Sequence, residues 1–205
     1  MKNKKIFYIG LSRSGTTSLH HILLELGFKS QHFCEFLLSD KPEWEKCEEF
    51  DALGDTPVPL LYKKLDQLYP DARFILTIRE KEKWLDSMKW MLRHGKVIWS
   101  WDEKTHKYHE SFYGTRSFNK KVLSEHWNNY HNDVFAYFSG REDSLLTIKL
   151  DEGFNVDKIC DFLDVPVKTI NNANSKKNPR RKALLRSRIK YNLKYYIKRI
   201  LKTNV

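Results

Sequence analysis

The chain has 205 residues, of which 40% are hydrophobic and 14% aromatic, and its formal net charge is +11. This supply of apolar side chains is enough to bury a core, which argues against a wholly disordered chain. Residues 176–205 hold twelve Lys and Arg and no acidic residue, so the rest of the chain, with 25 basic and 26 acidic residues, is close to neutral.

The first half of the chain predicts strands that alternate with helices. Residues 5–10 (KIFYIG) form an apolar run typical of a buried strand, and residues 11–14 form a loop. A helix is predicted from 15 to about 26, where Gly27 ends it. Short helices follow within 33–50, and residues 52–53 predict a brief strand.

The second half continues this alternation. Helices are predicted at 57–69, 81–93, 118–138 and 156–163, and strands at 73–79 and 144–150. Residues 94–117 are aromatic and irregular, and we interpret them as a flap or a substrate-facing insertion. The order of elements predicts an α/β protein with a mostly parallel central sheet covered on both faces, that is, a P-loop NTPase-like three-layer fold.

The chain divides into a domain over residues 1–175 and a basic segment over residues 176–205. The segment 171–179 (NNANSKKNP) reads as a linker, and apolar residues spaced three or four apart beyond it predict an amphipathic helix. Three interpretations of this helix stay open: packing on its own domain, docking on an anionic membrane, or contact with a polyanion, with nucleic acid the least favoured. The N-terminal apolar run is too short for a signal peptide or a membrane span, which predicts a cytoplasmic protein, either free or peripheral to the inner membrane surface.

Residues 10–17 read GLSRSGTT and have the glycine spacing of a phosphate-binding loop between a strand and a helix. Such a loop binds anions because successive backbone N–H groups and a helix N-terminus converge on one point. ATP- and GTP-binding loops also need a lysine directly after the second glycine, and Thr16 stands there. The cation is instead Arg13, inside the loop, so the loop predicts a phosphate compound other than a nucleoside triphosphate.

The stretch SRSGTT resembles the loop of sulfotransferases that use 3′-phosphoadenylyl sulfate (PAPS), whose typical form is K-S-G-T-T. The resemblance implies that Arg13, Ser14, Gly15, Thr16, Thr17 and Ser18 hold the 5′-phosphosulfate, with Arg13 near the bridging oxygen. It covers roughly residues 5–165 and is best at this loop and at 51–87. The nearest branch comprises single-domain members whose acceptors are mostly unassigned.

A second signature of that family is an arginine at a strand end with a serine eight positions later, both on the 3′-phosphate. Arg79 closes RFILTIR, and Ser87 lies in the next predicted helix. Physically, a guanidinium can form paired hydrogen bonds with phosphate oxygens while a hydroxyl near a helix start adds another. The resemblance therefore implies a separate 3′-phosphate site at Arg79 and Ser87.

Asp55, in the turn GDTP, lies where the family carries its catalytic base. The alternative is that Asp55 caps the helix that begins near Pro57. Histidines compete for the role of base: His20 and His21 follow the loop, His94, His106 and His109 lie in the irregular segment, and His126 and His131 share a long helix. Of these, His131 is the best candidate for a supporting role.

The resemblance therefore implies a PAPS-dependent sulfotransferase that works by in-line displacement, with Asp55 as a carboxylate base and Arg13 as a charge-neutralising catalytic residue. The acceptor would be a hydroxyl or an amine, for example on a carbohydrate or a lipid-linked glycan. The scattered cysteines (Cys34, Cys47 and Cys160) and the absence of a clustered ligand motif predict no metal site. The rival interpretations are a P-loop nucleotide kinase and a non-catalytic protein that binds nucleotide or membrane.

Overall fold

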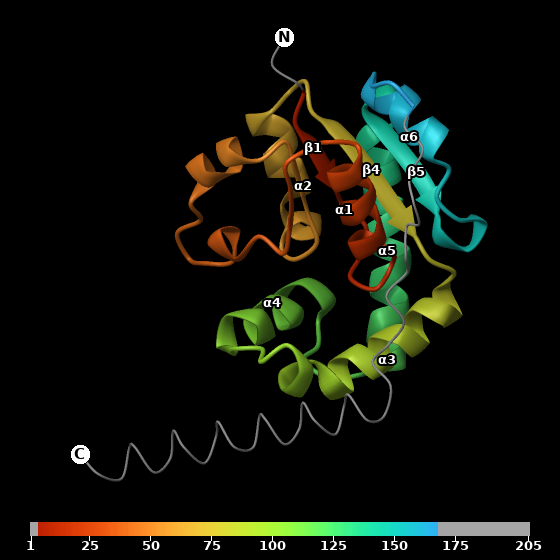
Figure 1. Cartoon of the computed structure of the whole chain (residues 1–205). Coiled ribbons are helices and arrows are strands. Elements are labelled where there is room, and N and C mark those ends of the chain that lie inside the picture. Colours follow the sequence, from red (N-terminus) through yellow and green to blue (C-terminus); the bar gives the residue numbers. More distant parts are fainter. Residues whose placement is uncertain (1–3, 168–205) are drawn as a thin grey trace.

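The computed structural model describes residues 4–167 and contains one five-stranded parallel sheet with strand order β2-β3-β1-β4-β5 (Figure 1). The strands are β1 (Ile6–Tyr8), β2 (Ser30–His32), β3 (Ala52–Gly54), β4 (Arg73–Ile78) and β5 (Leu145–Lys149). Each neighbouring pair is parallel, so all five strands end at the same edge of the sheet. Loops that follow the strands therefore meet at that edge.

Helices cover both faces of the sheet. On one face, α1 (Thr16–Glu25) and α6 (Val156–Leu163) pack on Ile6, Tyr8 and Ile75. On the other face, α2 (Val58–Leu68), α3 (Lys81–Ile98) and α5 (Lys120–Phe138) pack on Phe7 and Phe74. The predicted three-layer α/β fold is confirmed.

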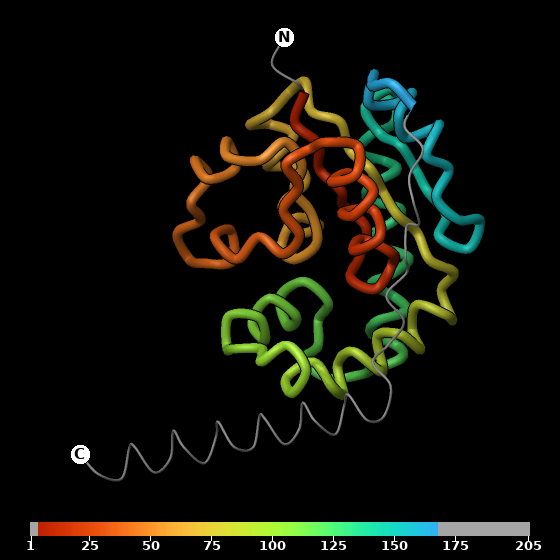
Figure 2. Tube along the Cα trace, in the orientation of Figure 1, coloured from red at the N-terminus to blue at the C-terminus, as the bar shows by residue number. Residues whose placement is uncertain are grey.

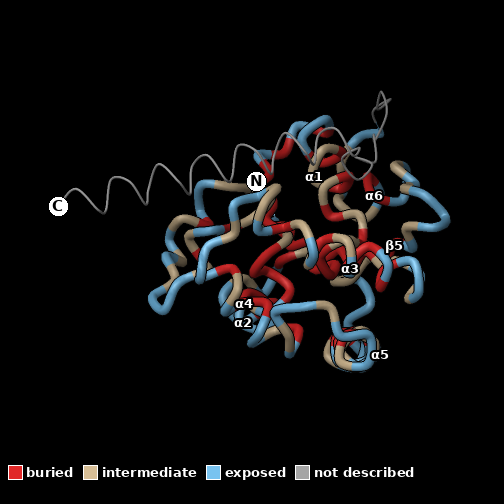
Figure 3. The backbone as a smooth tube through the Cα atoms, turned by 90° about the horizontal axis from the view of Figure 1, so that it is seen from below, coloured by how far each residue is buried: buried red, intermediate tan, exposed pale blue. Residues whose placement is uncertain are grey.

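The strand residues are apolar on both sides because both sides are covered. In β4, Phe74 and Leu76 belong to one core and Ile75 to the other, as the two-residue period of a strand requires. Figure 3 shows buried residues gathered in the interior and exposed residues on the outer turns.

Most of the segment 94–117 is helical, so the prediction that it is irregular was wrong. Helix α3 continues to Ile98, and α4 (Glu103–Tyr113) follows after a short turn (Figure 2). Asp102 caps α4 by accepting a hydrogen bond from the Thr105 N–H at 2.9 Å, and Gly114 ends it with φ 73°. The cap at the start of α4 and the glycine at its end favour the helix, although the apolar spacing between them is poor.

Other differences are local. Residues 33–50 form two 3-10 helices, Glu35–Leu37 and Trp44–Glu49, and strand β2 before them was not predicted. Two further 3-10 helices, Glu142–Ser144 and Leu150–Glu152, flank β5.

Within residues 4–167, no helix has the length and apolarity needed to span a bilayer. The predicted boundary at 175 and the basic segment 176–205 lie outside the described residues.

Candidate active site

The glycine loop, residues 10–15, connects β1 to α1 at the carboxyl edge of the sheet. Arg13 and Gly15 both have positive φ, 73° and 98°, which turns the chain sharply before α1 begins at Thr16. The first helical bond, from the Leu19 N–H to the Gly15 carbonyl at 3.1 Å, leaves the preceding N–H groups without intrahelical partners. No side chain caps this helix, so its positive end is suited to an anion.

The side chain of Ser14 fastens the loop to the sheet. Its hydroxyl donates to the Leu11 carbonyl at 2.6 Å and lies 3.0 Å from the Thr77 hydroxyl of β4. Ser14 is buried and is not part of the cavity wall beside the loop. Its side chain therefore supports the loop rather than facing a ligand.

A cavity of about 750 Å³ opens beside the glycine loop. Most of the predicted site residues line it, namely Arg13, Gly15, Thr16, Thr17, Ser18, Asp55 and Arg79. Ser87 and Ser14 do not. The carboxyl edge of the sheet supplies one side of the cavity, and residues of α3 and α4 supply the opposite wall.

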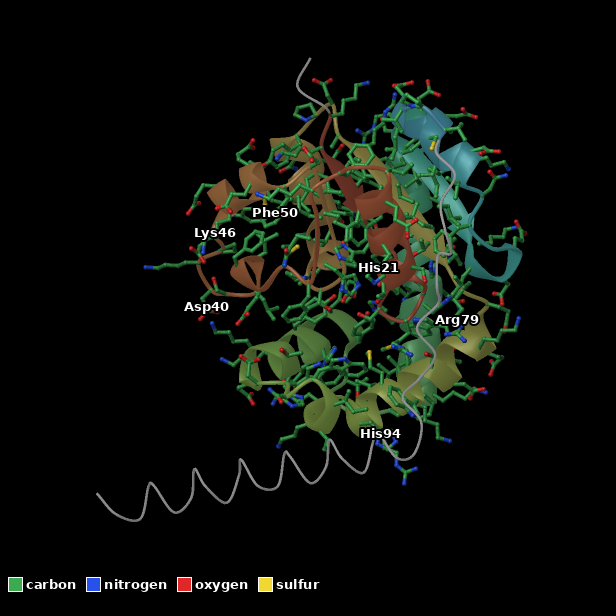
Figure 4. The ribbon with its side chains drawn as sticks, in the orientation of Figure 1. His21, Asp40, Lys46, Phe50, Arg79 and His94 are labelled. Atoms are coloured by element: carbon green, nitrogen blue, oxygen red, sulfur yellow. The ribbon has the colours of Figure 1, made fainter. Side chains whose placement is uncertain are left out.

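Arg13, Arg79 and Ser87 form one cluster, although they come from three separate elements. The Arg13 Nε donates to the Ser87 hydroxyl at 2.9 Å, and an Arg79 Nη1 donates to the Arg13 carbonyl at 3.3 Å. Burial and the positive charge of Arg79 lower the pKa of the Arg13 guanidinium from its ordinary value. Two close guanidinium groups at the wall of a cavity favour an anion as their common partner. Figure 4 shows Arg79 where β4 passes into α3.

Asp55 follows β3 and faces the glycine loop. One carboxylate oxygen, Oδ1, accepts a hydrogen bond from the Ser12 hydroxyl at 3.3 Å. Helix α2 begins at Val58 after Pro57, and no side chain caps it, so Asp55 is not its cap. The backbone of Asp55 has φ 60°, a left-handed conformation that is uncommon for a residue with a side chain and is concentrated at functional sites.

His32, which lies at the carboxyl end of β2, was not predicted as a site residue. Its Nε2 is 3.3 Å from the hydroxyls of both Thr16 and Thr17 and 3.6 Å from Oδ2 of Asp55. A three-residue strand with one buried residue carries almost no hydrophobic pattern, so nothing marked this histidine. The signal that could have found it is topological, because parallel pairing of β2 with β3 aligns His32 with Gly54.

Of the histidines weighed as alternatives, only His109 lines the cavity. It is buried against the ring of Trp101, 4.4 Å away between centroids, and its Nδ1 has no hydrogen-bond partner among the described residues. Burial lowers the pKa of His109 to about 4, so the ring is neutral near pH 7. His126 and His131 are packed on α5 away from the cavity, and His94 lies lower on α3 (Figure 4).

Aromatic and apolar side chains also line the cavity. They are Phe33, Leu38, Met91, Ile98, Trp99 and Trp101. The rings of Trp99 and Trp101 are stacked with centroids 5.8 Å apart. A Cβ on Gly95 would lie 2.4 Å from the Trp101 ring, so a glycine at this position lets the ring pack directly on α3.

The fold defines an α/β protein of the P-loop-like class, and comparison with known proteins assigns it further. Residues 5–178 match the family model described as the sulfotransferase domain, so the chain belongs to this family. A crystal structure of a sulfotransferase from Alicyclobacillus acidocaldarius has the same fold, with a TM-score of 0.55, 16% identity and 93% of each chain covered. A mouse sulfotransferase, SULT7A1, complexed with PAP has a TM-score of 0.49 and 15% identity over 93% of this chain and 64% of its own.

One curated relative also matches. It is protein M of the Ava biosynthesis cluster of Aspergillus versicolor, 32% identical in the matched part. That part covers 42% of this chain and 42% of the relative, so the chain matches less than half of the relative's length. Within residues 4–167, no group of three or more His, Cys, Asp or Glu side chains could hold a metal ion.

Proposed function

We propose that this sulfotransferase takes a sulfuryl group from 3′-phosphoadenylyl sulfate and passes it to a hydroxyl or an amine. The observation that carries the proposal is the grouping of Arg13, Arg79 and the uncapped N-terminus of α1 at one wall of the cavity. Two phosphate-bearing ends of one nucleotide need two cationic or N–H-rich positions, and this wall offers both.

In this proposal, the N–H groups of Gly15 to Ser18 and the Thr16 and Thr17 hydroxyls hold the 5′-phosphosulfate. Arg79 holds the 3′-phosphate. Ser87 supports this phosphate site through the hydrogen bond that its hydroxyl accepts from the Arg13 Nε. The role of Ser14 is to anchor the loop, with only its backbone near the anion. When bound, the nucleotide supplies the sulfuryl group and leaves as adenosine 3′,5′-bisphosphate.

The chain's own residues then move one proton and neutralise one charge. As the acceptor oxygen or nitrogen bonds to sulfur, its proton passes to the Asp55 carboxylate. The bond from sulfur to the bridging oxygen breaks, and the electron pair stays on the departing phosphate. The Arg13 guanidinium, held by Ser87, stabilises that growing negative charge.

The acceptor would enter from the aromatic side of the cavity. The flat rings of Trp99 and Trp101 are suited to contact with another ring, either aromatic or that of a sugar. We therefore propose a carbohydrate or a lipid-linked glycan as one class of acceptor. We also propose that the basic segment 176–205 docks on an anionic membrane, which cosedimentation with anionic vesicles tests.

A nucleotide kinase is the rival enzyme, and the residue after Gly15 argues against it. Thr16 has no positive charge to place on the β- and γ-phosphates of a nucleoside triphosphate. The two proposals differ in the ligand that stabilises the protein.

Calorimetric titration with adenosine 3′,5′-bisphosphate, with adenosine 5′-phosphate and with Mg²⁺–ATP tests the proposal. We expect the bisphosphate to bind most tightly and Arg79→Ala to weaken it about 10- to 100-fold, the worth of a charge-assisted phosphate contact. Arg93→Ala, which removes a positive charge from the exposed side of α3, is the matched control and should leave affinity unchanged. Equal binding of all three nucleotides, or tighter binding of Mg²⁺–ATP, would contradict the proposal.

A further inference from the structure

The imidazole of His32 joins two parts of the site, the start of α1 and the turn after β3. Its Nε2 lies 3.3 Å from the Thr16 and Thr17 hydroxyls at the start of α1, and 3.6 Å from Oδ2 of Asp55 after β3. One nitrogen atom therefore faces both the proposed phosphosulfate site and the proposed base.

The sheet fixes the position of His32. Strand β2 pairs with β3 in a register that sets His32 opposite Gly54, the residue before Asp55. Tyr8 stacks against the imidazole from the neighbouring strand β1, with ring centroids 6.4 Å apart. The Tyr8 hydroxyl also donates to the Gln31 carbonyl at 2.7 Å, which holds the end of β2.

Each oxygen of the Asp55 carboxylate has a polar side chain beside it. Ser12 donates to Oδ1 at 3.3 Å, and the His32 Nε2 faces Oδ2 at 3.6 Å. Both side chains of the pair are largely shielded, with 23% of His32 and 16% of Asp55 exposed, so bulk water supplies little alternative solvation. Without His32, Oδ2 would lose this neighbour, and the carboxylate would have more freedom to rotate about its side-chain bonds.

We propose that His32 is a positioning residue, which holds the Asp55 carboxylate at a fixed distance from the Thr16 and Thr17 hydroxyls. This inference rests on the proposed function, in which Asp55 is the base and the two threonines bind the phosphosulfate. A base that is misplaced by about 1 Å can cost about 10²-fold in rate, whereas nucleotide affinity depends on contacts elsewhere.

The test compares His32→Ala, His32→Gln and His21→Ala. Glutamine can keep an N–H near the place of Nε2, whereas alanine removes it. His21 lies half-buried in the middle of α1, the helix that begins with Thr16 and Thr17, and its ring contacts that of His20. His21→Ala therefore controls for the loss of a nearby histidine. Thermal unfolding of each variant checks that the fold is retained.

Three measurements are made on the full chain. They are the affinity for adenosine 3′,5′-bisphosphate, the rate at which that product is released from PAPS with water as sulfuryl acceptor, and the crystal structure without nucleotide. We expect His32→Ala to slow release about 10²-fold, to change affinity less than threefold and to turn the Asp55 carboxylate. His32→Gln should recover most of the rate, and His21→Ala should match the unmodified chain.

An Asp55 carboxylate that keeps its position in the His32→Ala crystal would overturn the positioning role, and this readout does not depend on turnover. An equal loss of affinity and rate would assign His32 to nucleotide binding instead, which also overturns it. If the unmodified chain does not bind the bisphosphate at all, the proposed function fails, and the two failures are thereby distinguished.

Discussion

The backbone of Asp55 is held in the left-handed region, at φ 60°, although the residue has a side chain. Such a conformation costs of order 1–3 kcal/mol and persists only where the surroundings hold it. Here the Asp55 carbonyl accepts a bond from the Val58 N–H at 2.7 Å, while its carboxylate turns back toward the glycine loop. The turn thereby aims an acidic side chain into a cavity instead of at the helix that follows.

Asp55→Asn should retain the fold and the nucleotide site but lose the base. Asparagine has nearly the same shape and can still accept the Ser12 hydrogen bond, but it does not take a proton near pH 7. We expect sulfuryl transfer to fall about 10²- to 10⁴-fold, the usual contribution of a general base, and bisphosphate affinity to stay within threefold. Release of product from PAPS and calorimetry measure the two quantities.

The control for this variant is Asp86→Asn, which changes an exposed carboxylate of α3. Its transfer rate should equal that of the unmodified chain. An Asp55→Asn protein that is as active as this control would remove Asp55 as the base.

Individual site residues could be predicted from the sequence only where a motif supplies them. The glycine loop stood out by its spacing along the chain, whereas Arg79 and Ser87 stood out only through the family resemblance. The structure brings Arg13 together with Arg79 and Ser87. The contact between Arg13 and Ser87 itself was not predictable, because it depends on how α3 lies against the loop. His32 was missed for the same reason, since only the pairing of β2 with β3 brings it to Asp55.

At the scale of elements, α4 is the clearest departure from the predictions. Its sequence, EKTHKYHESFY, places charged and imidazole groups between the aromatic residues, which weakens the helical period. The strands β4 and β5, in contrast, were predictable because their apolar runs are continuous. Asp102 before α4 and Gly114 after it are typical helix-end residues. They were not used as such, because the periodicity between them does not predict a helix.

Helix α4 should therefore depend strongly on its cap. Asp102 accepts bonds from both the N–H and the hydroxyl of Thr105, each at 2.9 Å, and these bonds lower the pKa of its carboxyl. We expect Asp102→Ala to reduce the free energy of unfolding by about 0.5–2 kcal/mol, the usual worth of a cap. Urea unfolding followed by circular dichroism measures this change.

Lys107→Ala, at an exposed position within α4, is the matched substitution. Alanine is a better helix former than lysine, so this variant should be neutral or slightly stabilising. Equal destabilisation by the two variants would show that the capping bonds contribute nothing.

For the molecule as a whole, three histidines link stability to pH: His109 and His131, which are buried, and His126, which is half-buried. Desolvation lowers the pKa of His131 from its ordinary value. Burial lowers the pKa of both His109 and His126 to about 4, below the ordinary value of 6.5. Below pH 6.5 the unfolded chain therefore binds protons at these rings that the folded chain does not, and the folded state loses stability as the pH falls. Each proton that only the unfolded chain binds changes the free energy of unfolding by about 1.4 kcal/mol per pH unit.

We expect the free energy of unfolding, measured in urea without nucleotide, to decrease as the pH is lowered from 6.5 to 5. In this window most carboxylates stay ionised, so the histidines account for the slope. His126→Gln should reduce this slope by the share of His126, while His109 and His131 keep theirs. A slope that is identical in the His126→Gln variant would contradict this assignment.

The two sides of the cavity come from separate parts of the chain. Strand ends and the glycine loop provide the cationic side, whereas residues 98–109, packed through Trp101 on Gly95, provide most of the opposite side. On the proposed function, donor and acceptor would then be recognised by independently variable pieces of sequence. Grafting that short stretch from another member of the family would exchange the acceptor preference and leave the grip on the nucleotide as it is.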